Sequence, residues 1–127
     1  MSDAIRYFKN AKEVLRQSPI EDDIYTDVKY VQEACSTAYL AILKALDAYF
    51  VRHGMPENEL PQSVEGYRAL LNKHLSTHNG KLNRKFETLL YKELHIAGYY
   101  RGLLTRTTLV KDAFKSAKEF IEKVETA

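Results

Sequence analysis

The chain has 127 residues, of which 28% are charged and 45% hydrophobic, and its net charge is +2. These values are ordinary for one globular domain, and the small net charge gives no indication of a nucleic-acid partner. The chain has a single cysteine, Cys35, which excludes an intrachain disulfide framework. The first residues lack the apolar run of a signal peptide, and no segment approaches the ~18 apolar residues of a membrane helix. We therefore expect residues 1–127 to form a single cytoplasmic domain without membrane contact.

Apolar residues recur at helical spacing in every long segment, which predicts an all-α fold. The first main helix is expected to start at Ser2 or Asp3, either of which can cap it, and to end before Pro19. The second is expected from about Asp23 to His53, with residues 21–23 supplying negative charge at its N-terminus. The apolar stripe of the first helix is Ala4, Phe8, Ala11 and Leu15, and that of the second helix is Val28, Val31, Cys35, Ala38, Ile42, Ala45 and Tyr49.

Three further helices are expected in the second half of the chain. Ser63 can cap a short helix that runs to His74, a long helix covers about Lys81 to Leu104, and the last helix ends near Glu125. The result is an up-down bundle of four main helices plus one short helix. The residues expected to face inward are Val64, Tyr67 and Leu71 on the short helix, Leu82, Phe86, Leu89, Ala97 and Tyr100 on the long helix, and Val110, Ala113, Ala117, Phe120 and Val124 on the last helix.

The stretch "ELHIAGYYRGLLTRT" combines two glycines with polar-tipped aromatic residues. A glycine inside a helix costs about 0.5–1 kcal/mol relative to alanine, so Gly98 and Gly102 need an offset. They admit a neighbouring helix of the same chain, a second chain, or a ligand or RNA. We expect the contact to be between two chains, with Gly98→Leu disrupting the dimer and leaving the helix intact. The candidate binding or interface strip comprises Tyr91, His95, Gly98, Tyr99, Arg101 and Gly102.

Three other positions carry residue types that are used in catalysis or metal binding. Cys35 lies on the apolar stripe of the second helix, which favours core packing over a nucleophilic role. His74 and His78 are one helical turn apart but lack the intervening Glu of a zinc protease, so we expect no metal. Arg68 and His74 have the spacing of an Arg-x5-His pair that can serve RNA cleavage, although decoration of a helix surface is the better explanation for them.

Between residue 4 and about residue 104 the chain contains the phrases "AIRYFKNAKEVLRQSPIEDDIYTDVKYVQEACSTAYLAILKALDAYF", "LPQSVEGYRALL", "NGKL" and "ELHIAGYYRG". These phrases resemble a small bacterial family of uncharacterised HEPN-like helical-bundle proteins. HEPN denotes the higher-eukaryote and prokaryote nucleotide-binding helical superfamily. The resemblance implies a bundle of four or five helices, commonly a homodimer, related to defence ribonucleases and to partners of small nucleotidyltransferases.

The chain departs from the ribonuclease members of that superfamily at one point. Those members place an Arg-x4-6-His motif late in the bundle, and no Arg in the last two helices here is followed by His at that spacing. We therefore expect a dimeric, non-catalytic binding module without a cofactor, with RNA, a nucleotide or a nucleotidyltransferase as its partner. There are two alternatives. The first is a metal-independent RNA endonuclease that uses either Arg68 and His74 or a rearranged pair of His95 and Arg101. The second is a purely structural adaptor without a polar groove.

Overall fold

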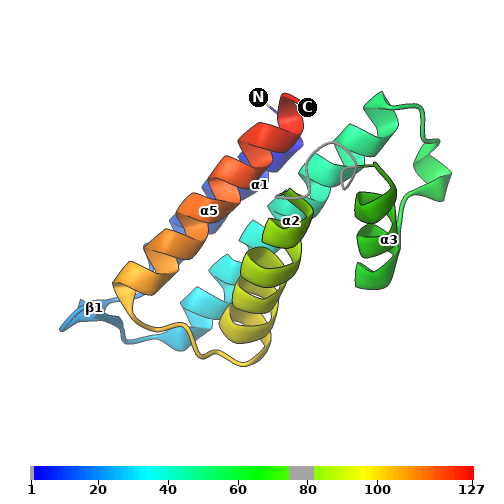
Figure 1. Cartoon of the computed structure of the whole chain (residues 1–127). Helices are drawn as coiled ribbons and strands as arrows, with labels where there is room; N and C mark the ends of the chain where they lie inside the picture. Colours follow the sequence, from blue (N-terminus) through cyan, green and yellow to red (C-terminus); the bar gives the residue numbers. More distant parts are fainter. Residues whose placement is uncertain (1, 75–81) are drawn as a thin grey trace.

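The computed structural model describes residues 2–74 and 82–127, and almost all of their regular structure is helical (Figure 1). Two long α-helices and a shorter one carry the first half of the described chain, together with a two-stranded hairpin. The second half contains a π-helix, η2, and a long α-helix. The elements are α1 (Asp3–Leu15), β1 (Ile20–Glu21), β2 (Ile24–Tyr25), α2 (Val28–Arg52), the 3₁₀ turn η1 (Glu57–Glu59), α3 (Val64–His74), η2 (Phe86–Tyr100) and α5 (Thr107–Glu125).

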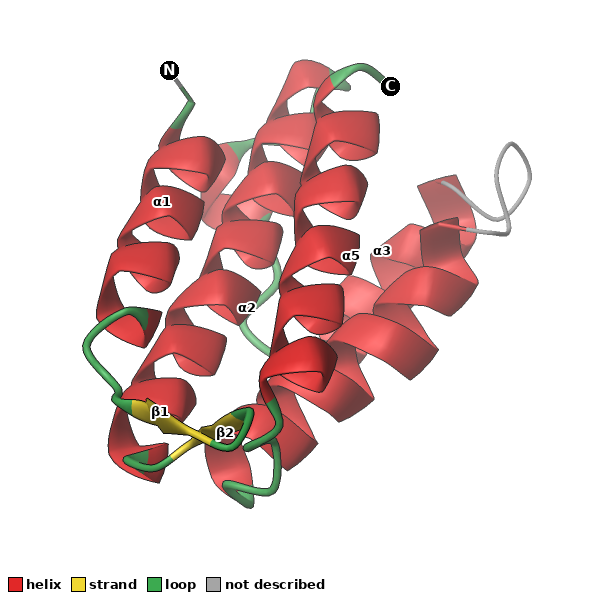
Figure 2. Ribbon diagram, turned by 90° about the vertical axis from the view of Figure 1, so that its left-hand side faces the viewer, coloured by secondary structure: helices red, strands yellow, loops and turns green. Residues whose placement is uncertain are grey.

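The four long helices run alternately up and down, and the two termini lie at the same end of the bundle (Figures 1 and 2). Helix α2 is central because it contacts α1, η2 and α5. Helix α3 is part of the long connection between α2 and η2 and lies on the side of the bundle away from α1 (Figure 1). The predicted all-α bundle of four main helices plus one short helix is therefore confirmed.

The predicted apolar stripes of α1, α2 and α5 form the core, with the exception of Val28, which is partly exposed at the first position of α2. The expected caps also form. Ser2 accepts a hydrogen bond from the backbone N–H of Ile5, and Ser63 accepts one from Gly66. By length and composition alone α2 is apolar enough to cross a membrane, contrary to the expectation from the sequence. The bundle buries one face of this helix, from Val31 to Phe50, while Val28, Leu40 and Val51 are exposed.

The start of the second helix was predicted wrongly, because residues 20–25 form a hairpin and α2 begins at Val28. Its cap is Asp27, whose carboxylate accepts a hydrogen bond from the backbone N–H of Lys29. Asp22 and Asp23 have φ values of +51° and +63°. Positive φ at both central residues is the signature of a tight hairpin turn, and Asp adopts it more readily than most residues. These two acidic residues therefore turn the chain and do not belong to the first turn of the helix.

The fourth main helix also differs from its prediction, since η2 ends at Tyr100 and has the wider winding of a π-helix. Residues 82–85 precede it as an α-helical turn. Because each π-type hydrogen bond spans one more residue than an α-type bond, the inward positions recur every four residues, so that Phe86, Leu94 and Gly98 are buried. The expected inward Tyr100 is instead 73% exposed, whereas Leu82 and Phe86 are buried as predicted. The side chain of Leu89 lies outside the described part of the structure.

Candidate functional site

Three residues of the candidate strip form a ladder of rings along one face of η2. The centroids of Tyr91 and His95 are 5.5 Å apart, those of His95 and Tyr99 are 5.7 Å apart, and both pairs are stacked. The common face that the spacing predicted for these residues is therefore present. Tyr39 of α2 adds a fourth ring, with its centroid 4.7 Å from that of His95. We call these four residues the ring ladder.

Tyr39 is the residue that sequence reasoning missed. It is 5% exposed, and its hydroxyl oxygen is buried without a hydrogen-bond partner among the described residues. Burial raises the pKa of this hydroxyl, and the neighbouring Tyr91 adds to the rise, so the group keeps its proton and can donate it in a hydrogen bond. A buried hydroxyl without a partner costs roughly 1–3 kcal/mol. No signal in the local sequence marks it, because Tyr39 simply continues the apolar face of α2.

A groove of about 400 Å³ opens beside the ring ladder, between α2, the segment before α3, α3 itself and η2. Tyr39 and His95 belong to both the ladder and the groove. No lysine, arginine, aspartate or glutamate is among the described residues that line it. Those residues are Ser36, Tyr39, Leu40, Leu43, Pro61, Gln62, Ser63, Val64, Tyr67 and His95. The groove is therefore an uncharged surface with several hydrogen-bonding side chains.

Two polar pairs fix the side chains at the margin of this groove. The Tyr67 hydroxyl donates a hydrogen bond of 2.7 Å to the Asp47 carboxylate, which ties α3 to α2. The Arg68 guanidinium binds Glu87 at 2.7 Å and lies 4.7 Å from the centroid of the Tyr91 ring. Since the Arg68–Glu87 pair is partly exposed, we assign it at most about 1 kcal/mol of stability. Its main effect is to hold the outer end of the ring ladder in place.

The structure does not bring Arg68 and His74 together as a catalytic pair. Arg68 is directed to Glu87 and Tyr91 of η2, whereas the His74 ring packs against Phe50 of α2 with 5.8 Å between the centroids. His78, the second member of the expected histidine pair, lies outside the described residues. Within residues 2–74 and 82–127, no group of three or more His, Cys, Asp and Glu side chains is arranged to hold a metal ion.

The two glycines of the strip have different roles inside the chain. A Cβ atom at Gly98 would lie 2.6 Å from the Sγ atom of Cys35, so this glycine allows η2 to approach α2. Gly102 follows the end of η2 with φ of +61° and lies against Gln32. It therefore turns the chain and does not share the face of the ring ladder, contrary to the prediction. Arg101 is exposed at the C-terminal end of η2.

Burial lowers the pKa of His95 below its usual value, so its imidazole is neutral near pH 7. Below pH ~6.5, the ordinary pKa of an unfolded-chain histidine, the unfolded state then binds more protons than the folded state, and stability falls as the pH falls. We expect His95→Gln to reduce this loss of stability between pH 7 and pH 5, measured by urea unfolding. The exposed His53 at the end of α2 gives the matched control His53→Gln, and equal pH dependence in wild type and His95→Gln would contradict the assignment.

The comparisons with known proteins agree on the family of this chain. A solved structure of a protein of unknown function from Dyadobacter fermentans has a TM-score of 0.76 and 33% sequence identity, with 98% of this chain and 91% of that chain covered. No curated protein matches the chain. The model of the family described as a domain of unknown function, DUF5618, matches residues 1–126. The chain therefore belongs to the DUF5618 family.

Proposed function

We propose that this protein is a non-catalytic binding module whose groove beside the ring ladder takes an uncharged planar ring of the nucleobase class. The observation that carries the proposal is the buried Tyr39 hydroxyl, which has no hydrogen-bond partner among the described residues. Tyr39 lines the groove, and a ligand that displaces the side chains covering its hydroxyl would bring a hydrogen-bond acceptor to that buried group. The resemblance to HEPN-like proteins supports the same ligand class.

The chemistry of the groove narrows the ligand further. Stacked Tyr and His rings offer flat faces for a base, and stacking of one base on an aromatic side chain is worth about 1–3 kcal/mol. The groove volume of about 400 Å³ is within the usual range for small ligands. Since no lysine or arginine lines the groove and His95 is neutral, phosphate groups gain little there. We therefore expect the base itself, in a nucleoside or a single-stranded RNA, to be the recognised group.

Titration calorimetry with adenosine, uridine and adenosine monophosphate tests the proposal. Wild-type protein should bind at least one nucleoside, and adenosine and its monophosphate should bind with similar affinity. Tyr39→Phe, which removes only the hydroxyl, should weaken binding about fivefold, while the matched control Tyr30→Phe on the same helix, outside the groove, should leave it unchanged. Absence of nucleoside binding at millimolar concentration, or equal binding by Tyr39→Phe, would contradict the proposal.

Homodimer formation is a second part of the proposed function, and a separate observation favours it. Tyr99, Tyr100 and Leu103 are 42%, 73% and 61% exposed at the end of η2, and partly exposed Val28 lies beside Gly102 in the same region. Exposed apolar side chains gathered in one place are typical of contact surfaces. A two-fold dimer would bury one copy of this patch against another.

Gly98 is already buried against Cys35 of its own chain, so a substitution at Gly98 would not test the dimer. The test of the dimer is therefore a substitution in the exposed patch. We expect wild-type protein to sediment as a dimer at high concentration and the double variant Tyr100→Lys, Leu103→Lys to sediment as a monomer. Leu109→Lys, which changes an exposed leucine on α5, is the matched control and should remain dimeric. Monomeric wild-type protein would contradict this part of the proposal.

We also predict that the purified protein does not cleave single-stranded RNA. The separate packing of Arg68 and His74 supports binding over catalysis. The measurement is incubation of a fluorescently labelled RNA with the protein, with and without a metal chelator. Rapid cleavage that is lost in His74→Ala or His95→Ala would favour the endonuclease alternative instead.

A further inference from the structure

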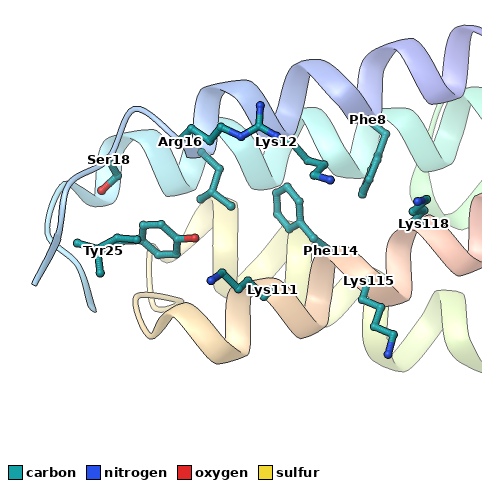
Figure 3. A pocket seen from close by; sticks show the side chains of 11 residues that line it. Phe8, Lys12, Arg16, Ser18, Tyr25, Lys111, Phe114, Lys115 and Lys118 are labelled. Carbon is teal, nitrogen blue, oxygen red and sulfur yellow. The ribbon is translucent and has the colours of Figure 1, made fainter. Parts of the chain in front are cut away.

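A second groove, of about 590 Å³, lies between α1, α5 and the hairpin. These elements are not the ones that form the groove beside the ring ladder. The two grooves share no lining residue. Figure 3 shows its side chains, with the rings of Phe8 and Phe114 between the two helices. The lining residues are Phe8, Lys12, Leu15, Arg16, Ser18, Ile20, Tyr25, Lys111, Phe114, Lys115 and Lys118.

The charged side chains of this groove are all basic and come from both walls. Lys12 lies in the last turn of α1 and Arg16 follows the end of this helix, while α5 contributes Lys111, Lys115 and Lys118. Among the described residues, no carboxylate lines the groove and none forms an ion pair with any of these five side chains. Five cations that line one groove and form no ion pair among the described residues favour a bound anion.

The floor between the two basic walls is apolar and has little exposed area. The centroids of Phe8 and Phe114 are 5.8 Å apart, and these rings are only 4% and 5% exposed. Leu15 and Tyr25 continue this floor toward the hairpin. The aliphatic stems of the lysines extend the apolar surface while their ammonium groups reach solvent. A helix of a partner protein, about 10 Å wide, needs a broader apolar face than this one, whereas a single alkyl chain does not.

We propose that this groove binds a free single-chain anionic amphiphile, with its alkyl chain along the Phe8–Phe114 floor and its carboxylate or phosphate head on the lysines and Arg16. The combination of an apolar floor with basic walls is complementary to both halves of such a molecule. The volume of about 590 Å³ is suited to a small ligand. The Tyr25 hydroxyl, which Figure 3 shows directed into the groove, adds a hydrogen-bond donor for the head.

Titration calorimetry with decanoate and decyl phosphate, each below its micelle concentration, tests the proposal and separates the two head groups. At least one of them should bind at a single site, more weakly as salt is added, while decyltrimethylammonium, with the same chain and opposite charge, should not bind. Acetate and inorganic phosphate, which lack the chain, should bind much more weakly. Binding of decyltrimethylammonium as tight as that of the anions, or absence of binding by both anions, would overturn the proposal.

Charge variants locate the site. The double variant Lys111→Gln, Lys115→Gln neutralises two cations of the α5 wall and should weaken binding of the anion about tenfold. Lys123→Gln removes a charge from the same helix outside the groove and should leave the affinity unchanged. All three lysines are exposed or on the helix surface, so these variants should fold, as circular dichroism would verify. Equal weakening by Lys123→Gln would show a nonspecific charge effect and contradict the assignment.

Discussion

Replacement of Gly98 by leucine is expected to destabilise the folded chain by about 3 kcal/mol. A Cβ atom at this position would lie 2.6 Å from Cys35 Sγ and 2.9 Å from Cys35 Cβ, closer than packed atoms approach. The larger side chain must therefore push η2 away from α2, which also disturbs the contact of His95 with Tyr39. Urea unfolding monitored by circular dichroism measures the loss. A Gly98→Leu variant with the wild-type unfolding midpoint would contradict this packing.

A double-mutant cycle shows whether Cys35 is the cause. Gly98→Ala introduces only the Cβ atom, and Cys35→Ala removes the sulfur that is closest to it. We expect Gly98→Ala to be less destabilising in the Cys35→Ala background, with a coupling energy of about 1 kcal/mol. Additive free energies would mean that the strain comes from another neighbour.

Burial raises the pKa of the Cys35 thiol to about 12, with a further contribution from Glu93, which agrees with a structural role for this cysteine.

Phe120→Ala is expected to be among the most destabilising single truncations of the core, at about 3–5 kcal/mol. Phe120 is fully buried on α5, and its ring centroid lies 6.3 Å from that of Phe86 of η2. Its removal leaves a cavity where α5 meets η2 and forfeits the apolar burial of the ring. Because small domains are stable by only about 5–15 kcal/mol, this loss is a large part of the total.

The matched control for Phe120 is Leu109→Ala, because Leu109 lies on the same helix and is 49% exposed. Exposed substitutions of this kind change the free energy of unfolding by about 0.5 kcal/mol or less. Urea unfolding of both variants provides the comparison. Similar losses for the two would mean that α5 is not packed as described.

The sequence predicted the apolar stripes of α1, α2 and α5 well because their core contacts follow the α-helical period. On α1, Ala4, Phe8 and Ala11 lie on one face in any α-helix, and that face is buried. The same argument failed for η2, because nothing local specifies π winding, and Tyr100 was placed inward by an α-helical count. The hairpin was missed for a different reason. Its turn is Asp22-Asp23, and neither residue is the glycine or asparagine that usually marks such a turn.

The sites were predictable only where their residues are close in sequence. Tyr91, His95 and Tyr99 belong to one helix, so their common face could be read from spacing. Tyr39 completes the ladder from another helix, and the state of its hydroxyl depends on what η2 places around it. The basic groove combines residues from opposite ends of the chain, since Lys12 and Lys111 become neighbours only when α1 and α5 pack in the same bundle.

The most direct test of the central claim, that the ring ladder and its groove bind a nucleobase, is a ¹H–¹⁵N NMR titration of the wild-type protein with adenosine. The residues that line the groove are known, so the position of the ligand can be read from the amide signals that move. We predict shifts at Tyr39, Tyr67 and His95 that saturate with a single dissociation constant. Unchanged signals at these residues up to millimolar adenosine, or shifts confined to the groove between α1 and α5, would contradict the claim.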